Sequence, residues 1–153
     1  KSGKDITLVA MSYMSIEAIH AADYLEKQGI SCEVIDLRTI KPLDWETLME
    51  SVSKTGHLLA LDSGFSTGSV AGEIIARVSM EKFNVLKSAP ARLAMPDVPE
   101  PTSPALTKGF YVRAADVAEK VMDMLGKDTG QVRKDLTEPR PHDIPGKWFT
   151  GPF

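Results

Sequence analysis

The chain has 153 residues, of which 42% are hydrophobic and 25% charged, and it carries a formal net charge of −3. This length suits one hydrophobic core and is too short for two ordinary domains, and the composition is that of a soluble globular protein. A weakly acidic chain without a Lys/Arg run has no general attraction to nucleic acid or to an anionic membrane. Its apolar runs are far shorter than the roughly 20 residues that a membrane-spanning helix needs.

Lys1 opens the sequence in place of Met, which indicates that the sequence begins inside a longer protein. Cys32 is the only cysteine and so has no partner within the chain for a disulfide. This cysteine usage favours a reducing compartment, which is the cytoplasm, or the mitochondrial matrix if the source is eukaryotic.

The first expected elements are a strand and a helix. Residues 5–10 (DITLVA) are rich in β-branched side chains and predict a short buried strand. A helix should follow and end before Gly29, because glycine commonly terminates helices. The residues expected on its buried face recur at helical spacing: Ile16, Ile19, Ala22 and either Leu25 or Tyr24.

Residues 30–44 (ISCEVIDLRTIKPLD) are the central segment for the fold prediction, because they contain a strand, a loop and the start of a helix. They contain an apolar strand, with Val34, Ile35 and Leu37, that must close near Ile40, because Pro42 cannot donate a hydrogen bond to a sheet. Asp44 is placed to cap the next helix, over residues 45–54, which Gly56 ends. The segment is half of a βαβ unit, and its neighbours supply the other half.

The next elements repeat the alternation of strand and helix. Residues 57–61 (HLLAL) lack polar alternation, which is typical of a parallel strand covered on both faces. A loop over 62–68, a helix over 69–83 and a strand over 90–95 follow. The sequence therefore predicts an α/β fold, a three-layer α/β/α sandwich with a mostly parallel sheet.

Prolines crowd residues 96–104 and predict an extended loop, after which helical periodicity returns over 112–125. We expect one α/β domain over residues 1–126 and a proline- and aromatic-containing extended tail over 127–153. Burying large rings is favourable, so the tail aromatics should lie at an interface with a partner or fold back onto their own domain. These rings are Trp148, Phe149 and Phe153.

Three glycines, Gly64, Gly68 and Gly72, occur where a strand gives way to a helix. Main-chain N–H groups at such a helix start can bind an anion. The spacing matches neither a P-loop nor a dinucleotide fingerprint. The alternative is close packing, in which Gly68 and Gly72 let the helix approach a neighbouring backbone.

Charged residues near the strand ends are further candidates. Asp62 and Glu73 could form an acid/base pair, or Glu73 could pair with Arg77 one helical turn away. Asp36 and Arg38 lie at the carboxyl end of a strand, the usual ligand edge of a parallel sheet. There they could bind a ligand, pair with each other or contact a neighbouring subunit.

Several ordered motifs resemble one family. They are EVIDLRTIKPLD (33–44), KTGH (54–57), GSVAGEI (68–74) and PDVP (96–99), with Ala105-Leu106 before the last helix. Together they resemble the C-terminal domain of transketolase-like thiamine diphosphate enzymes. The resemblance is closer to the beta subunit of the decarboxylating component of 2-oxo acid (pyruvate or branched-chain) dehydrogenase complexes.

This resemblance implies an assembly role within a parent enzyme that uses thiamine diphosphate and magnesium. The family's cofactor-binding domains have no counterpart in this sequence, so the resemblance implies no catalytic, cofactor-binding or metal residue here and no cofactor on the isolated domain. Implied partners are a second copy in a homodimer, an alpha-type subunit and the acyltransferase core, which would dock through its small basic binding domain. The alternatives are a stand-alone nucleotide- or coenzyme-binding module, or the C-terminal domain of a transketolase or sugar-phosphate synthase.

Overall fold

The computed structural model describes residues 1–137, 141–146 and 148–149. Within them, one sheet contains β1 (Ile6–Ala10), β2 (Cys32–Asp36), β3 (Leu58–Phe65) and β4 (Ala91–Met95). The strand order is β2-β1-β3-β4 and every neighbouring pair is parallel. In the register of the sheet, Leu8 lies between Val34 of β2 and Leu59 of β3.

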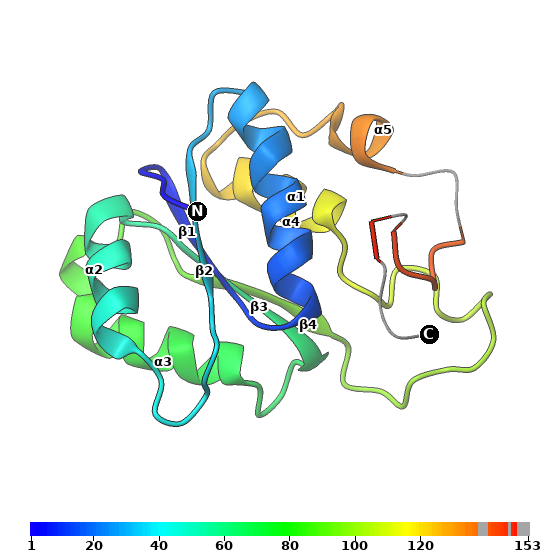
Figure 1. Cartoon of the computed structure of the whole chain (residues 1–153), viewed down its shortest axis with the longest axis horizontal. Helices are drawn as coiled ribbons and strands as arrows, with labels where there is room; N and C mark the ends of the chain where they lie inside the picture. Colours follow the sequence, from blue (N-terminus) through cyan, green and yellow to red (C-terminus); the bar gives the residue numbers. More distant parts are fainter. Residues whose placement is uncertain (138–140, 147, 150–153) are drawn as a thin grey trace.

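Helices cover both faces of this sheet (Figure 1). α1 (Tyr13–Lys27) and α4 (Ala114–Met124) pack on one face, and α2 (Trp45–Thr55) and α3 (Val70–Lys82) pack on the other. From β1 the chain crosses to β2 at one edge of the sheet. It then crosses back over β1 to β3 and continues to β4 at the other edge. Because βαβ crossovers are right-handed, this reversal places α1 opposite α2 and α3. The predicted three-layer α/β/α fold is confirmed.

The core is built by alternation along fully buried strands. In β1, Ile6, Leu8 and Ala10 belong to the core cluster under α1 and α4, whereas Val9 belongs to the cluster under α2 and α3. The buried Thr7 also points to the second face, where its hydroxyl bonds Ser51 and Thr55 of α2, both at 2.8 Å. Each face of β1 therefore packs against its own layer of helices.

The predicted helix boundary at Asp44 is confirmed. The strand end expected near Ile40 was wrong, because β2 ends at Asp36, where its partner β1 ends at Ala10. The carboxylate of Asp44 accepts the N–H of Thr47 at 3.1 Å, and Gly56 ends α2 in the left-handed conformation with φ of 77°. Helices at both ends of the fold begin and end close to the expected positions. α1 stops at Lys27 just before Gly29, and the helix expected from residue 112 begins at Ala114.

The predicted end of the third strand was wrong. β3 runs on to Phe65, so Asp62 and Gly64 lie in a strand and not in a loop. The extension depends on a neighbour distant in sequence, because β4 pairs Leu61 with Leu93 and Phe65 with Met95 across an irregularity in register. A bulged pairing of this kind tolerates residues with low strand propensity.

The buried face of α1 was also predicted wrongly in part. Ile16 and Ile19 are 36% and 40% exposed, although Ala22 and Leu25 are buried as expected. The helix instead turns its small side chains toward the sheet, together with Met14, because small residues allow helix and strands to approach closely. This face comprises Met14, Ala18, Ala21, Ala22 and Leu25.

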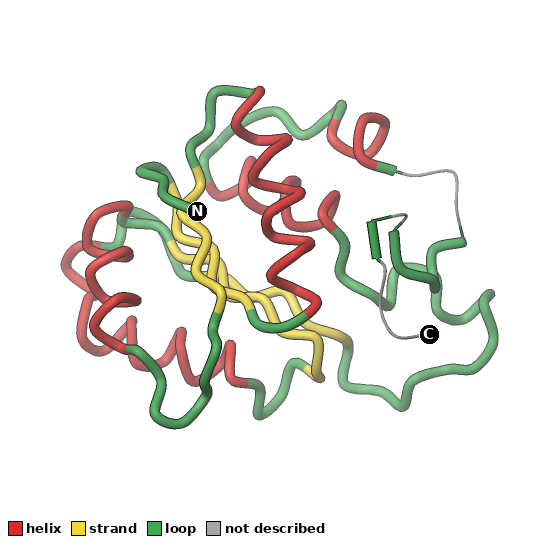
Figure 2. The backbone as a smooth tube through the Cα atoms, in the orientation of Figure 1, coloured by secondary structure: helices red, strands yellow, loops and turns green. Residues whose placement is uncertain are grey.

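The tail is not extended throughout. A short helix, α5 (Val132–Leu136), lies in the region expected to be extended. The remaining short element, the 3-10 segment η1 (Phe83–Val85), lies outside the tail and follows α3. Val132 is only 1% exposed and joins the core cluster beneath α1 and α4. Figure 2 shows α5 on the same side of the sheet as α1. Among the described helices, none has the length and apolar character needed to cross a bilayer.

Candidate functional site

The carboxyl end of β2 carries a small polar cluster. Asp36 accepts a hydrogen bond from Ser15 of α1 at 2.6 Å and an ion pair from Arg38 at 3.1 Å. Of the alternatives for Asp36 and Arg38, the structure contains the pair between them. Because the Arg38 side chain is 85% exposed, this pair contributes little to stability.

The glycines at the β3–α3 connection have different surroundings. Gly68 adopts φ of 75° with open space around it, so its role there is conformational. A Cβ added at Gly72 would lie 2.9 Å from a terminal guanidinium nitrogen of Arg92. The close neighbour of Gly72 is therefore a flexible side chain of β4, not a backbone as the packing interpretation expected.

A carboxylate of the proline-rich loop binds the loop before α3. Asp97, from the proline-rich loop, accepts the N–H of Thr67 at 2.8 Å and its hydroxyl at 2.7 Å. These two bonds, helped by the charge of Arg92, lower the pKa of Asp97 below its usual value. Ser69 then caps α3 by accepting the N–H of Gly72 at 3.0 Å. The chain's own side chains thus occupy donors that a bound anion would use.

Asp62 has a structural contact at the same connection. It is 8% exposed and accepts main-chain N–H groups from Gly64 at 2.8 Å and Ala71 at 3.4 Å. Glu73, in contrast, is exposed in the first turn of α3. The suggested pairing of Glu73 with Arg77 was wrong, since Arg77 donates instead to Glu81 at 2.6 Å and lies 4.2 Å above the ring of Trp45.

The tail aromatics fold against their own domain. Trp148 packs at a tilt against Tyr13 and edge-on against His20 of α1, with ring centroids 5.3 and 5.0 Å apart. The ring of Phe149 lies 6.0 Å from that of Tyr13. Phe153 lies outside the described residues. A cavity of about 510 Å³ is formed between α1, the start of α4 and this part of the tail.

A buried charge joins α1, α4 and the tail. Glu17 is 4% exposed and accepts the Tyr13 hydroxyl and the Ala114 N–H, both at 2.7 Å. Arg113 approaches the same carboxylate at 3.4 Å and also donates to the carbonyls of His142 and Ile144, at 2.9 and 2.8 Å. Burial and the bond to Glu17 raise the pKa of Tyr13.

The sequence analysis did not identify Glu17 and Arg113. One signal was available, because Glu17 stands next to Ala18 on the face of α1 that carries Met14 and Ala21. A carboxylate on such a face needs a partner, since an unpaired buried charge is costly. The identity of that partner could not be read from spacing, because Arg113 is 96 residues away.

Metal and thiol chemistry find little support among the described side chains. In residues 1–137, 141–146 and 148–149, no three His, Cys, Asp or Glu groups are arranged to hold a metal ion. Cys32 is buried in β2, and burial raises the pKa of its thiol to about 12. The thiolate, which is the reactive form, is therefore scarce at neutral pH.

The fold and these contacts define an α/β domain with a fully parallel sheet, in which most of the predicted site residues bind other parts of the same chain. Residues 1–117 match the family described as "Transketolase, C-terminal domain". The chain belongs to that family.

Several similar proteins are named as beta subunits of pyruvate dehydrogenase E1 or of an acetoin oxidoreductase. The chain is 41% identical over 126 residues to the mitochondrial pyruvate dehydrogenase E1 component subunit beta of Ascaris suum, which covers 82% of this chain and 35% of the relative. Identity to the corresponding subunit of Rhizobium meliloti is 42% over 121 residues, covering 79% of this chain and 26% of the relative. A beta subunit of an acetoin:2,6-dichlorophenolindophenol oxidoreductase from Cupriavidus necator is 37% identical over 118 residues. This match covers 77% of this chain and 35% of the relative. The matched part therefore spans 26–35% of the length of these relatives.

A solved structure of related sequence has the same fold. The inactive beta4 tetramer of a split-gene transketolase superposes with a TM-score of 0.71 at 31% sequence identity. The match covers 82% of this chain and 41% of that one.

Proposed function

We propose that the chain is the C-terminal assembly domain of a thiamine diphosphate-dependent 2-oxo acid dehydrogenase beta subunit, of the pyruvate, branched-chain or acetoin type. The observation that carries this proposal is the 37–42% identity to three beta subunits, which extends over most of this chain but over only 26–35% of theirs. A domain of that extent would support subunit pairing and docking of the acyltransferase core. Thiamine diphosphate and magnesium would bind elsewhere in the parent protein.

The contacts at the carboxyl edge of the sheet support a role without catalytic side chains. The carboxylate of Asp62 binds two main-chain amides, and that of Asp97 binds Thr67. A general acid or base must instead be free to contact a substrate. This arrangement also disfavours the alternative of a nucleotide-binding module at the glycine-rich connection, because Asp97 occupies its donors.

Exposed apolar side chains offer a surface for subunit pairing. At the end of α3, Met80 and Phe83 are 77% and 73% exposed, and Val85 is 40% exposed. Large apolar groups in one short segment favour contact with another protein surface. An alpha-type subunit and a second copy of the chain are the partners that we propose for such surfaces. The relatives named mitochondrial and those from bacteria are compatible with a mitochondrial matrix or cytoplasmic setting.

Docking of the acyltransferase core is tested by calorimetry with its small basic binding domain. The chain's net charge of −3 should add attraction, so binding should be measurable at low salt and weaken as salt rises. A matched basic domain from an unrelated protein serves as the control. Equal binding of both domains, or of neither, would contradict the docking proposal.

A further inference from the structure

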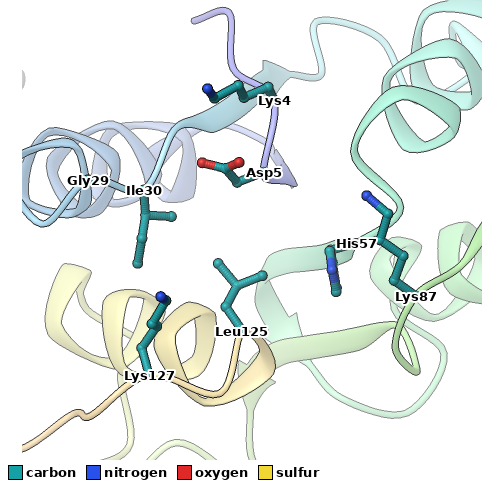
Figure 3. Close-up of a pocket in the computed structure, with 8 residues that line it drawn as sticks. All are labelled: Lys4, Asp5, Gly29, Ile30, His57, Lys87, Leu125 and Lys127. Carbon is teal, nitrogen blue, oxygen red and sulfur yellow. The ribbon is translucent and has the colours of Figure 1, made fainter.

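The amino ends of the strands surround a second cavity, on the edge of the sheet away from the residues discussed above. It has a volume of about 300 Å³ and lies between the starts of β1 and β3 and the ends of α1 and α4. Figure 3 shows Ile30 and Leu125 pointing toward one another within it and basic side chains placed around them. The basic residues are Lys4, Lys87, Lys127 and His57, and the acidic one is Asp5.

The positive charge at this cavity exceeds the negative charge. Asp5 is the one carboxylate among the lining residues, and it accepts the main-chain N–H of Ser31 at 2.7 Å. Burial, helped by the ammonium group of Lys87, lowers the pKa of His57 and favours the neutral form of its ring. Three lysines and one carboxylate therefore line this cavity, in a chain whose overall charge is negative.

Lysines near helix ends often serve to bind the last free carbonyls. This explains Lys87, which donates to the Thr55 carbonyl at the end of α2 at 2.9 Å. It does not explain Lys127, because the main-chain N–H of Lys127 already satisfies the Met122 carbonyl of α4 at 2.8 Å. In the part of the chain that the structure describes, the ammonium groups of Lys4 and Lys127 have no hydrogen-bonded acceptor or ion pair.

We propose that this cavity binds a small oxyanion, whose charged oxygens Lys4 and Lys127 hold while Ile30 and Leu125 contact its body. The volume suits an anion of the size of phosphate or a short-chain carboxylate. Phosphate and carboxylate share the acceptor oxygens that ammonium groups recognise. The site goes beyond the proposed function and does not depend on it.

The test uses the 153-residue chain with inorganic phosphate, and separately with acetate and succinate. Thermal unfolding is followed at millimolar anion against sodium chloride of equal ionic strength, since an anion that binds the native state raises the melting temperature. The Lys4→Gln/Lys127→Gln double variant should bind about tenfold more weakly, because it loses two charge-assisted hydrogen bonds. Lys134→Gln is the control with a single charge removed from exposed α5, outside the cavity.

Chemical-shift mapping by NMR gives a second readout on the wild-type chain. Phosphate or a carboxylate should shift the amides of Gly29, His57 and Lys127 more than those of α5. A larger effect of phosphate would identify a phosphate site, and a larger effect of acetate or succinate a carboxylate site. The proposal is overturned if no anion exceeds chloride, or if the double variant responds as the wild type does.

Discussion

Glu17 accepts the main-chain N–H of Ala114 at 2.7 Å and so joins the middle of α1 to the first turn of α4. Its other carboxylate oxygen accepts the hydroxyl of Tyr13. Glu17→Ala would leave these donors and Arg113 without their acceptor in a buried position, which should lower the free energy of unfolding by about 2–4 kcal/mol. Urea denaturation measures the change.

Two further variants make this measurement specific. Glu17→Gln keeps the shape and one acceptor oxygen and should cost less than Glu17→Ala. Glu50→Ala removes an exposed glutamate from α2 and should change stability little. A loss at Glu17 no larger than that at Glu50 would contradict the bridging role.

The Asp97–Thr67 contact should make the protein sensitive to acid. The pKa of Asp97 is lower in the folded chain than its usual 3.8, so folding favours the ionised carboxylate. This contribution is fully present above pH 3.8 and decreases as the pH falls through the lowered folded value. The free energy of unfolding of Asp97→Asn should therefore fall less on acidification in that range than the free energy of unfolding of the wild type. Glu73→Gln, with the same charge change on an exposed residue, should follow the wild type, as followed by urea denaturation at a series of pH values.

Gly68 and Gly72 should respond differently to alanine. Gly68→Ala places a side chain at φ of 75°, a left-handed conformation that costs about 1–2 kcal/mol even where space is free. Gly72→Ala gains helix propensity but displaces the flexible Arg92 side chain, so its effect should stay within about 0.5 kcal/mol. Chemical denaturation of both variants compares them directly. A larger loss at Gly72 would indicate tighter packing than the structure shows.

Removal of residues 127–153 should destabilise the domain itself. Val132 belongs to the main core and Trp148 packs against Tyr13, so truncation after Gly126 exposes apolar surface on α1 and α4. Val132→Ala alone should cost about 1–3 kcal/mol. Thermal and urea unfolding of the monomer measure both effects. Unchanged stability combined with lost partner binding would show instead that the tail is an interface element.

Thiamine diphosphate with magnesium should leave the melting temperature of the isolated chain unchanged. The proposed parent enzyme binds this cofactor in other domains, and only a ligand of the native state stabilises it. Differential scanning calorimetry with and without the cofactor tests this. Magnesium alone is the control, and a rise of several degrees specific to thiamine diphosphate would contradict the assignment.

Local features of the fold could be predicted where their causes are local. Asp44 and Gly56 set the start and the end of α2 through their own side-chain and backbone chemistry. The end of β2 at Asp36 could not be predicted from Pro42, since it depends on the length of the neighbouring β1. The extension of β3 to Phe65 could not be predicted, since it depends on the register of β4. The orientation of α1 was ambiguous for another reason: Ile16 and Ile19 have the same helical spacing as the alanines, and close contact with the sheet favours the alanines.

The candidate site was less predictable than the fold. Asp36 and Arg38 were identified from their place at a strand end, and they do contact each other. Asp97 and Thr67 are 30 residues apart, and Glu17 and Arg113 are 96 apart, so neither contact leaves a periodic signal. Such contacts depend on how the crossovers bring loops together.

Because Cys32 is buried, the rate at which its thiol is alkylated reports unfolding of the sheet. Because this single thiol sits in a strand of the sheet, with a pKa of about 12, alkylating reagents reach and modify it only when the sheet opens. The fraction labelled in a short pulse then measures how often β2 separates from β1, without any introduced probe. Every stability comparison above can be repeated in this way inside a mixture, including one that contains a binding partner.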